Sequence, residues 1–137
     1  MCPSPMDEFD PPPETHRDML DRMTLQNLVD LDDGGTGLLS EMIGIFREDT
    51  PRRIQDILSA ANGGDATALS HAGHALKGGA GALGANAMRR FAADIETLGR
   101  GGSVETGPEL SRQLEELFQA SLTALEAYVA NLPANSQ

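Results

Sequence analysis

The 137-residue sequence contains few of the residues on which many small domains depend: one cysteine, no tryptophan, one tyrosine and four phenylalanines. A single cysteine, Cys2, excludes an internal disulfide framework. With so few aromatic side chains, the core must consist mainly of Leu, Ile, Ala and Met, which favours helices over a sheet. No apolar run approaches the roughly 20 residues that cross a bilayer. The N-terminus lacks the basic start and apolar segment of a secretory signal, so we expect a cytoplasmic protein.

Basic residues are also scarce. The chain has 10 Lys and Arg residues against 21 Asp and Glu residues, which gives a formal net charge of −11. A charge of this sign is repelled by phosphate backbones and by anionic lipid surfaces. It therefore argues against a general binder of nucleic acid or membranes. The simplest explanation of the charge itself is a well-solvated surface.

The N-terminal segment differs in composition from the rest of the chain. Residues 1–22 hold five of the eight prolines and several acidic groups, with little to bury. We predict that they form a disordered or loosely docked tail. Residues 23–132 are then predicted to form one domain, followed by a short C-terminal tail at 133–137.

The apolar periodicity of the first half of this domain predicts two helical regions. A short helix runs to about Asp32, with Thr24 as its N-cap. A second region begins near Gly37. Its expected apolar side consists of Leu38, Met42, Ile45 and Phe46. At Pro51 either one helix kinks or two helices abut.

Three breaks divide the rest of the domain into helices. Residues 62–65 form a turn, residues 84–87 form a second break, and residues 99–108 form a glycine-rich loop. Long amphipathic helices with short connections pack against one another. The sequence thus predicts an all-α fold, an antiparallel up-and-down four-helix bundle with a short additional N-terminal helix.

The stretch HAGHALKGGAGALG, residues 71–84, is unusual for a helix because it holds five glycines. On an ideal helix one direction collects a set of apolar residues that forms the core face: Leu69, Ala72, Leu76, Ala80 and Leu83. His74 lies roughly 160° from that direction. Gly78, Gly81 and Ala85 lie on the same far side, and Lys77 flanks it at about 100°. The geometry predicts an exposed histidine surrounded by residues with almost no side chain.

This arrangement suits a nucleophile that another protein must reach. A large residue at position 78 would lean over the imidazole of His74, because positions i and i+4 are neighbours on a helix. Lys77, the only lysine in the chain, can contact a phosphoryl oxygen as a point charge. Neutral imidazole is available at cytoplasmic pH, since the histidine pKa is about 6.5. The alternative function of the glycines is close packing between helices.

The residues His74-Ala75-Leu76-Lys77-Gly78, followed by Gly84-Ala85, resemble the H-x-L-K-G…G-A signature of histidine-containing phosphotransfer (HPt) domains. The resemblance implies that His74 is the phosphoacceptor, with Lys77 and Gly78 as supporting residues. It implies a monomeric phosphocarrier, not an enzyme with kinase activity of its own. Its partners would be response-regulator receiver domains and a hybrid sensor histidine kinase. The receiver would supply Mg²⁺, and the chain itself would need no cofactor. The tail at residues 1–22 would be dispensable for transfer.

The remaining candidates surround this motif. We expect Gly81, His71, Arg89 and Arg90 to contribute to partner docking, although solvated arginines explain the last two equally well. Two alternatives to phosphotransfer use the same residues or the same fold. His71 and His74 are spaced to share a metal, but no cysteine or nearby third histidine completes a ligand set, so no metal site is predicted. A helical adaptor that binds a receiver or kinase without carrying phosphate would have the same fold.

Overall fold

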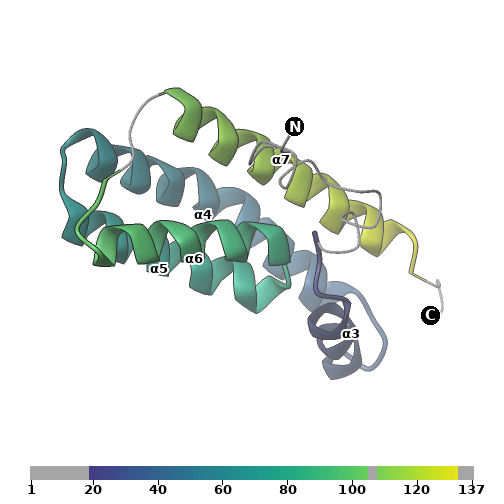
Figure 1. The fold of residues 1–137 in the computed structure, drawn as a ribbon. Coiled ribbons are helices and arrows are strands. Elements are labelled where there is room, and N and C mark those ends of the chain that lie inside the picture. Colours follow the sequence, from purple (N-terminus) through teal and green to yellow (C-terminus); the bar gives the residue numbers. More distant parts are fainter. Residues whose placement is uncertain (1–18, 105–107, 133–137) are drawn as a thin grey trace, which may run out of the picture.

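The computed structural model describes residues 19–104 and 108–132, which contain five helices and no strand. The helices are α3 (Arg22–Leu31), α4 (Gly37–Asn62), α5 (Ala66–Leu83), α6 (Asn86–Arg100) and α7 (Pro108–Ala130). The four long helices pack lengthwise as a bundle, and α3 lies across one end, in contact with α4 and α5 (Figure 1). The predicted all-helical class is confirmed. None of the described helices is long and apolar enough to cross a membrane.

Helix α4 continues without interruption through Pro51. Pro51 cannot donate to the carbonyl one turn earlier, a loss on the order of 3 kcal/mol. Buried side chains on both sides of it, Thr50 and Ile54, keep the helix packed against its neighbours and offset that loss. Of the two alternatives at this position, the structure has one helix.

The predicted apolar side of α4 is confirmed at Phe46, wrong at Ile45, and shifted by one position elsewhere. The buried residues are Leu39, Ile43 and Phe46, whereas Ile45 is 55% exposed. Leu38 and Met42 are only partly buried. Two adjoining stripes of α4 are apolar, so periodicity alone cannot choose between them. Packing against neighbouring helices decides which stripe is buried. Phe46, which belongs to both stripes, faces α7, and its ring centroid lies 5.6 Å from that of Phe118.

The N-cap of α3 is Asp21, not Thr24 as predicted. The Asp21 carboxylate accepts hydrogen bonds from the backbone of Met23 at 3.1 Å and from the Thr24 hydroxyl at 3.0 Å. Its backbone N–H donates to the Gly84 carbonyl at 2.8 Å, and Leu20 beside it is buried. Residues 19–22, assigned to the tail from composition, therefore pack on the end of α5. The rest of the predicted tails, residues 1–18 and 133–137, lies outside the described residues.

Two glycines bring α5 and α6 into backbone contact. A Cβ added at Gly73 would lie 2.8 Å from the backbone nitrogen of Glu96, and one at Gly99 would lie 2.6 Å from the backbone nitrogen of Ser70. Real Cβ atoms do not approach backbone this closely, so any side chain at either position forces the helices apart. Close packing between helices, the alternative function considered for the glycines of residues 71–84, is therefore the function of Gly73, which lies on the buried side of α5.

Ser121 on α7 is an uncompensated polar group in the core. It is fully buried, and its hydroxyl has no hydrogen-bond partner within the described part of the chain. A buried hydroxyl without a partner destabilises a fold by about 1–3 kcal/mol. We expect Ser121→Ala to raise the free energy of unfolding by about 1 kcal/mol, measured by urea denaturation. The exposed Ser59→Ala in α4 is the control, since it gains helix propensity alone. An equal rise in the free energy of unfolding for the two variants would contradict the conclusion that the buried Ser121 hydroxyl destabilises the fold.

Candidate functional site

Helix α5 presents His74 near its middle and is held at both ends. Asp65 caps the N-terminus by accepting from the backbone of Ala68 at 3.0 Å. Gly84 ends the helix with a left-handed φ of 76°, which a residue with a side chain rarely adopts. The His74 side chain is 68% exposed, as ideal helix geometry predicts. The site is therefore a surface position on a well-defined helix.

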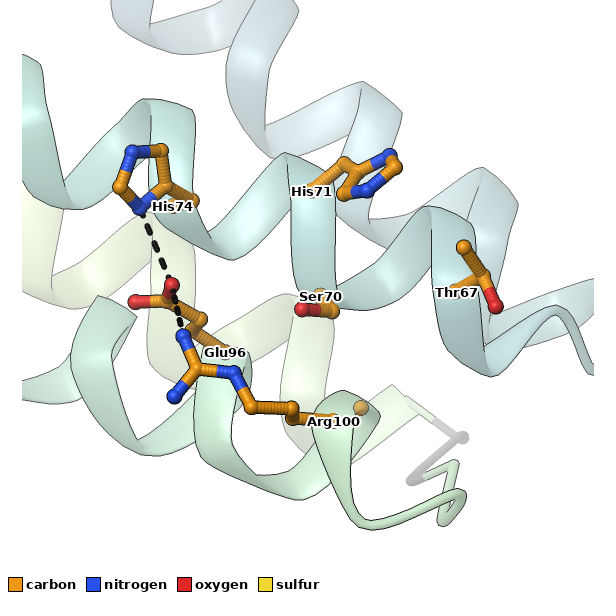
Figure 2. Close-up of a pocket in the computed structure, with 7 residues that line it drawn as sticks. Thr67, Ser70, His71, His74, Glu96 and Arg100 are labelled. Carbon is orange, nitrogen blue, oxygen red and sulfur yellow. Dashed lines mark hydrogen bonds and ion pairs between the residues drawn. The ribbon is translucent and has the colours of Figure 1, made fainter.

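Glu96 on α6 is the residue that organises the site, and the sequence analysis missed it. Its side chain is only 6% exposed, and its carboxylate binds three groups. Oε2 lies 3.0 Å from Nδ1 of His74 and 2.5 Å from Nη2 of Arg100, while Oε1 lies 2.7 Å from Nζ of Lys77. Figure 2 shows Glu96 between His74 above and Arg100 below. One buried acid thus joins α5 to α6 at the candidate phosphoacceptor.

These contacts keep Glu96 ionised. The hydrogen bond from Lys77, helped by the one from His74 and by the charges of Lys77 and Arg100, lowers the pKa of Glu96 below its ordinary value against the opposing effect of burial. An ionised carboxylate can only accept hydrogen bonds, so Nδ1 of neutral His74 must carry the ring hydrogen. The lone pair is then on Nε2, on the other side of the ring. The contact with Glu96 selects the tautomer that a nucleophile at Nε2 requires.

Gly78 leaves the approach to His74 open. It is exposed, and among the described residues no atom other than the backbone of its own helix lies within 4 Å of the place a Cβ would occupy. Lys77 makes an ion pair that the sequence analysis did not predict. It is 33% exposed and bound to Glu96 in this structure. Its predicted contact with a phosphoryl oxygen stays a prediction.

The predicted docking residues lie on both α5 and α6. Arg89 packs over Gly81, because a Cβ at Gly81 would lie 3.2 Å from Cδ of Arg89. Arg89 also donates to the side chain of Asn86 at 2.8 Å. Arg90 is exposed on α6, and His71 is exposed one turn before His74. Ala85, expected on the exposed side, is fully buried because α5 has already ended at Leu83.

A pocket of about 530 Å³ adjoins the site between α5 and α6 (Figure 2). His74, Glu96 and Arg100 line one part of it, and His71 lines it with the hydroxyl residues Ser70 and Thr67. Within residues 19–104 and 108–132, no group of three His, Cys, Asp or Glu side chains is arranged to hold a metal ion. The arrangement supports nucleophilic chemistry at Nε2 of His74 with electrostatic support from neighbouring side chains.

A weak signal for Glu96 exists in the sequence. The buried stripe of α6 includes Ala92, Ile95 and Gly99, and Glu96 lies at its edge among these apolar and small residues. An acidic residue in such a position is seldom buried without a partner. The sequence does not show that this partner is His74, because the pairing depends on how α5 and α6 cross.

Residues 41–128 match the family model of the Hpt domain. The match covers well over half of the chain and includes all of α5 and α6. No curated protein and no solved structure matches the chain. The Hpt domain is a helical phosphocarrier of two-component signalling that works with receiver domains and kinases and is not itself a kinase domain. The chain belongs to the histidine-containing phosphotransfer (Hpt) domain family.

Proposed function

We propose that the protein accepts a phosphoryl group on Nε2 of His74 from the aspartyl phosphate of a receiver domain and passes it to a second receiver in a phosphorelay. The observation that carries this proposal is the contact between Nδ1 of His74 and the buried Glu96, 3.0 Å apart. It directs the lone pair of the ring to an exposed nitrogen beside the open position at Gly78.

The proposed step needs no base from this chain. The Nε2 lone pair attacks phosphorus, the bond between phosphorus and the aspartyl oxygen breaks, and the receiver carboxylate leaves with the electron pair. The imidazole becomes a positively charged ring that carries the phosphoryl group, and its hydrogen stays on Nδ1. The anionic Glu96 stabilises the new ring charge through its hydrogen bond to Nδ1. Transfer to the next receiver is the same step in reverse.

The partner completes the site in this proposal. The receiver supplies Mg²⁺ and the acidic pocket that stabilises the transferring group, and this chain supplies position and access. We further propose that the protein is a cytoplasmic monomer built as an up-and-down antiparallel four-helix bundle. A hybrid sensor histidine kinase and response regulators are the proposed partners. Their receiver domains would dock on the exposed face of α5 around His74.

Transfer from isolated receivers tests the proposal. Each candidate receiver is phosphorylated with a radioactive donor, freed of that donor and mixed with the protein in Mg²⁺. We expect rapid appearance of label on this chain from at least one receiver, in the acid-labile, alkali-stable form that marks phosphohistidine. A receiver that binds the chain, measured by calorimetry, without any transfer would overturn the proposal in favour of the adaptor function.

Replacing Gly78 with leucine should slow phosphoryl transfer to His74 without lowering the stability of the protein. The new side chain would cover the approach to His74, so we expect the transfer rate to fall by on the order of 10-fold to 100-fold. The melting temperature should hold or rise, because a glycine inside a helix is less stable than leucine by up to about 1 kcal/mol. Gly44→Leu on α4 is the matched control, since its Cβ position is equally open. Equal transfer rates for Gly78→Leu and the wild-type protein would contradict the access argument.

A further inference from the structure

The carboxylate of Glu96 faces two cations, although one would neutralise it. Lys77 on α5 binds Oε1 at 2.7 Å, and Arg100, four residues after Glu96 on α6, binds Oε2 at 2.5 Å. The two cations differ in their surroundings: Lys77 is 33% exposed, whereas Arg100 at the end of α6 is 69% exposed. The second cation calls for an explanation, because exposed ion pairs by themselves contribute little to stability.

The explanation lies in what happens to Lys77. Under the proposed function, phosphorylation places a strongly negative group on Nε2 of His74, and Lys77 is one helical turn away on the same helix. In the exchange proposed below, the Lys77 ammonium leaves Oε1 of Glu96 and turns to the phosphoryl oxygens. If Lys77 were the sole cation, its departure would leave the buried carboxylate with the phosphorylated His74 ring alone, and the phosphoryl group offsets the positive charge of that ring, which is strongly unfavourable. Lys77 would then remain on Glu96.

We propose that Arg100 is a positioning residue that frees Lys77 for the phosphoryl group by keeping Glu96 neutralised and bound to His74. This inference rests on the proposed function. Arg100 suits the task because it binds Oε2, the oxygen that also accepts from Nδ1 of His74, and leaves Oε1 to Lys77. It reaches Glu96 from the side away from His74, as Figure 2 shows, so it can stay in place when Lys77 moves. Lys77 exchanges partners, and Arg100 does not.

Lys77 is the only lysine in the chain, which makes this exchange directly observable. Protein grown with lysine labelled with ¹³C at Cε and ¹⁵N at Nζ gives one side-chain signal in an NMR spectrum. Potassium phosphoramidate, which phosphorylates histidine without a receiver, serves as the donor, and ³¹P spectra count the phosphohistidine formed. We expect the Lys77 signal of the wild-type protein to shift on phosphorylation. In Arg100→Ala the signal should stay in place, since Lys77 remains on Glu96.

The lifetime of the phosphohistidine provides a second measurement. Loss of a charge-assisted contact to the phosphoryl group should shorten it by on the order of tenfold. We expect this shortening in Lys77→Ala and, to a similar degree, in Arg100→Ala. Arg112→Ala on α7 is the matched control, because it removes the same charge from an exposed arginine that also binds carboxylates, those of Glu109 and Glu116. It should leave the Lys77 shift and the lifetime unchanged. Arg100→Gln, which removes the charge and keeps a donor, is used if Arg100→Ala is poorly folded by circular dichroism.

The outcomes are distinct. A Lys77 signal that moves equally in Arg100→Ala and in the wild-type protein would overturn the inference. So would a Lys77 signal that stays in place in wild-type protein whose ³¹P spectrum shows phosphohistidine. Wild-type protein that forms no phosphohistidine, and receives none from any receiver, would overturn the proposed function itself.

Discussion

His74→Gln should abolish labelling by a phosphorylated receiver, whereas His71→Gln should leave it largely intact. The physical reason is the neighbourhood of each ring. Nδ1 of His74 is bound to Glu96, which leaves the Nε2 lone pair for the proposed attack, and Lys77 and Gly78 lie at i+3 and i+4. Within the described residues, the His71 ring is bound to no carboxylate, and His74 and Ala75 follow it at the same spacings. Radioactive transfer from the same receiver preparation measures all variants.

Lys77→Ala belongs to the same series and should lower labelling without eliminating it, because the nucleophile remains. The His74 side chain is 68% exposed, so its replacement by Gln should leave the helical content and melting temperature close to those of the wild-type protein. Circular dichroism checks this for each variant. Label that persists in His74→Gln and disappears in His71→Gln would show that the assignment of the phosphoacceptor is wrong.

Gly73→Ala and Gly99→Ala should both reduce stability and slow transfer, although alanine is the better helix former. The new methyl group at 73 would lie 2.8 Å from the backbone nitrogen of Glu96, and the one at 99 would lie 2.6 Å from backbone atoms of α5. Ordinary carbon contacts need about 3.5 Å, so the helices must separate by about 0.5 Å or more. A movement of this size takes the 3.0 Å contact of Glu96 with His74 to the limit of a hydrogen bond.

The expected loss of stability is about 1–3 kcal/mol for each variant, measured by urea denaturation. Transfer is measured well below the melting temperature, so that a slower rate reports the site and not unfolding. Gly79→Ala on the exposed side of α5 is the control. Its Cβ would meet only the Arg53 side chain, at 3.9 Å, so it should gain up to about 1 kcal/mol. Gly73→Ala with wild-type stability and wild-type transfer would disprove the close-contact argument.

Gly78 and Gly73 lie in the same helix, but only the role of Gly78 can be predicted from the sequence. Exposure of His74 and Gly78 follows from their angle to the apolar stripe of a single helix. Gly73 belongs to the same stretch, yet its importance comes from α6, which the helical wheel of α5 does not contain. The error in α4 has the same cause, since its buried stripe depends on how α4 packs against α5 and α7.

By itself, the sequence determined the helical class and the local arrangement of His74, Lys77 and Gly78, because these depend on helix periodicity and on neighbours three and four residues apart. Only the tertiary structure decided that Glu96, 22 residues after His74, lies against Nδ1 and holds Lys77 and Arg100. That contact exists because Gly73 and Gly99 allow α5 and α6 to touch through their backbones. Distances between helices depend on how side chains of different segments pack, which no single segment specifies.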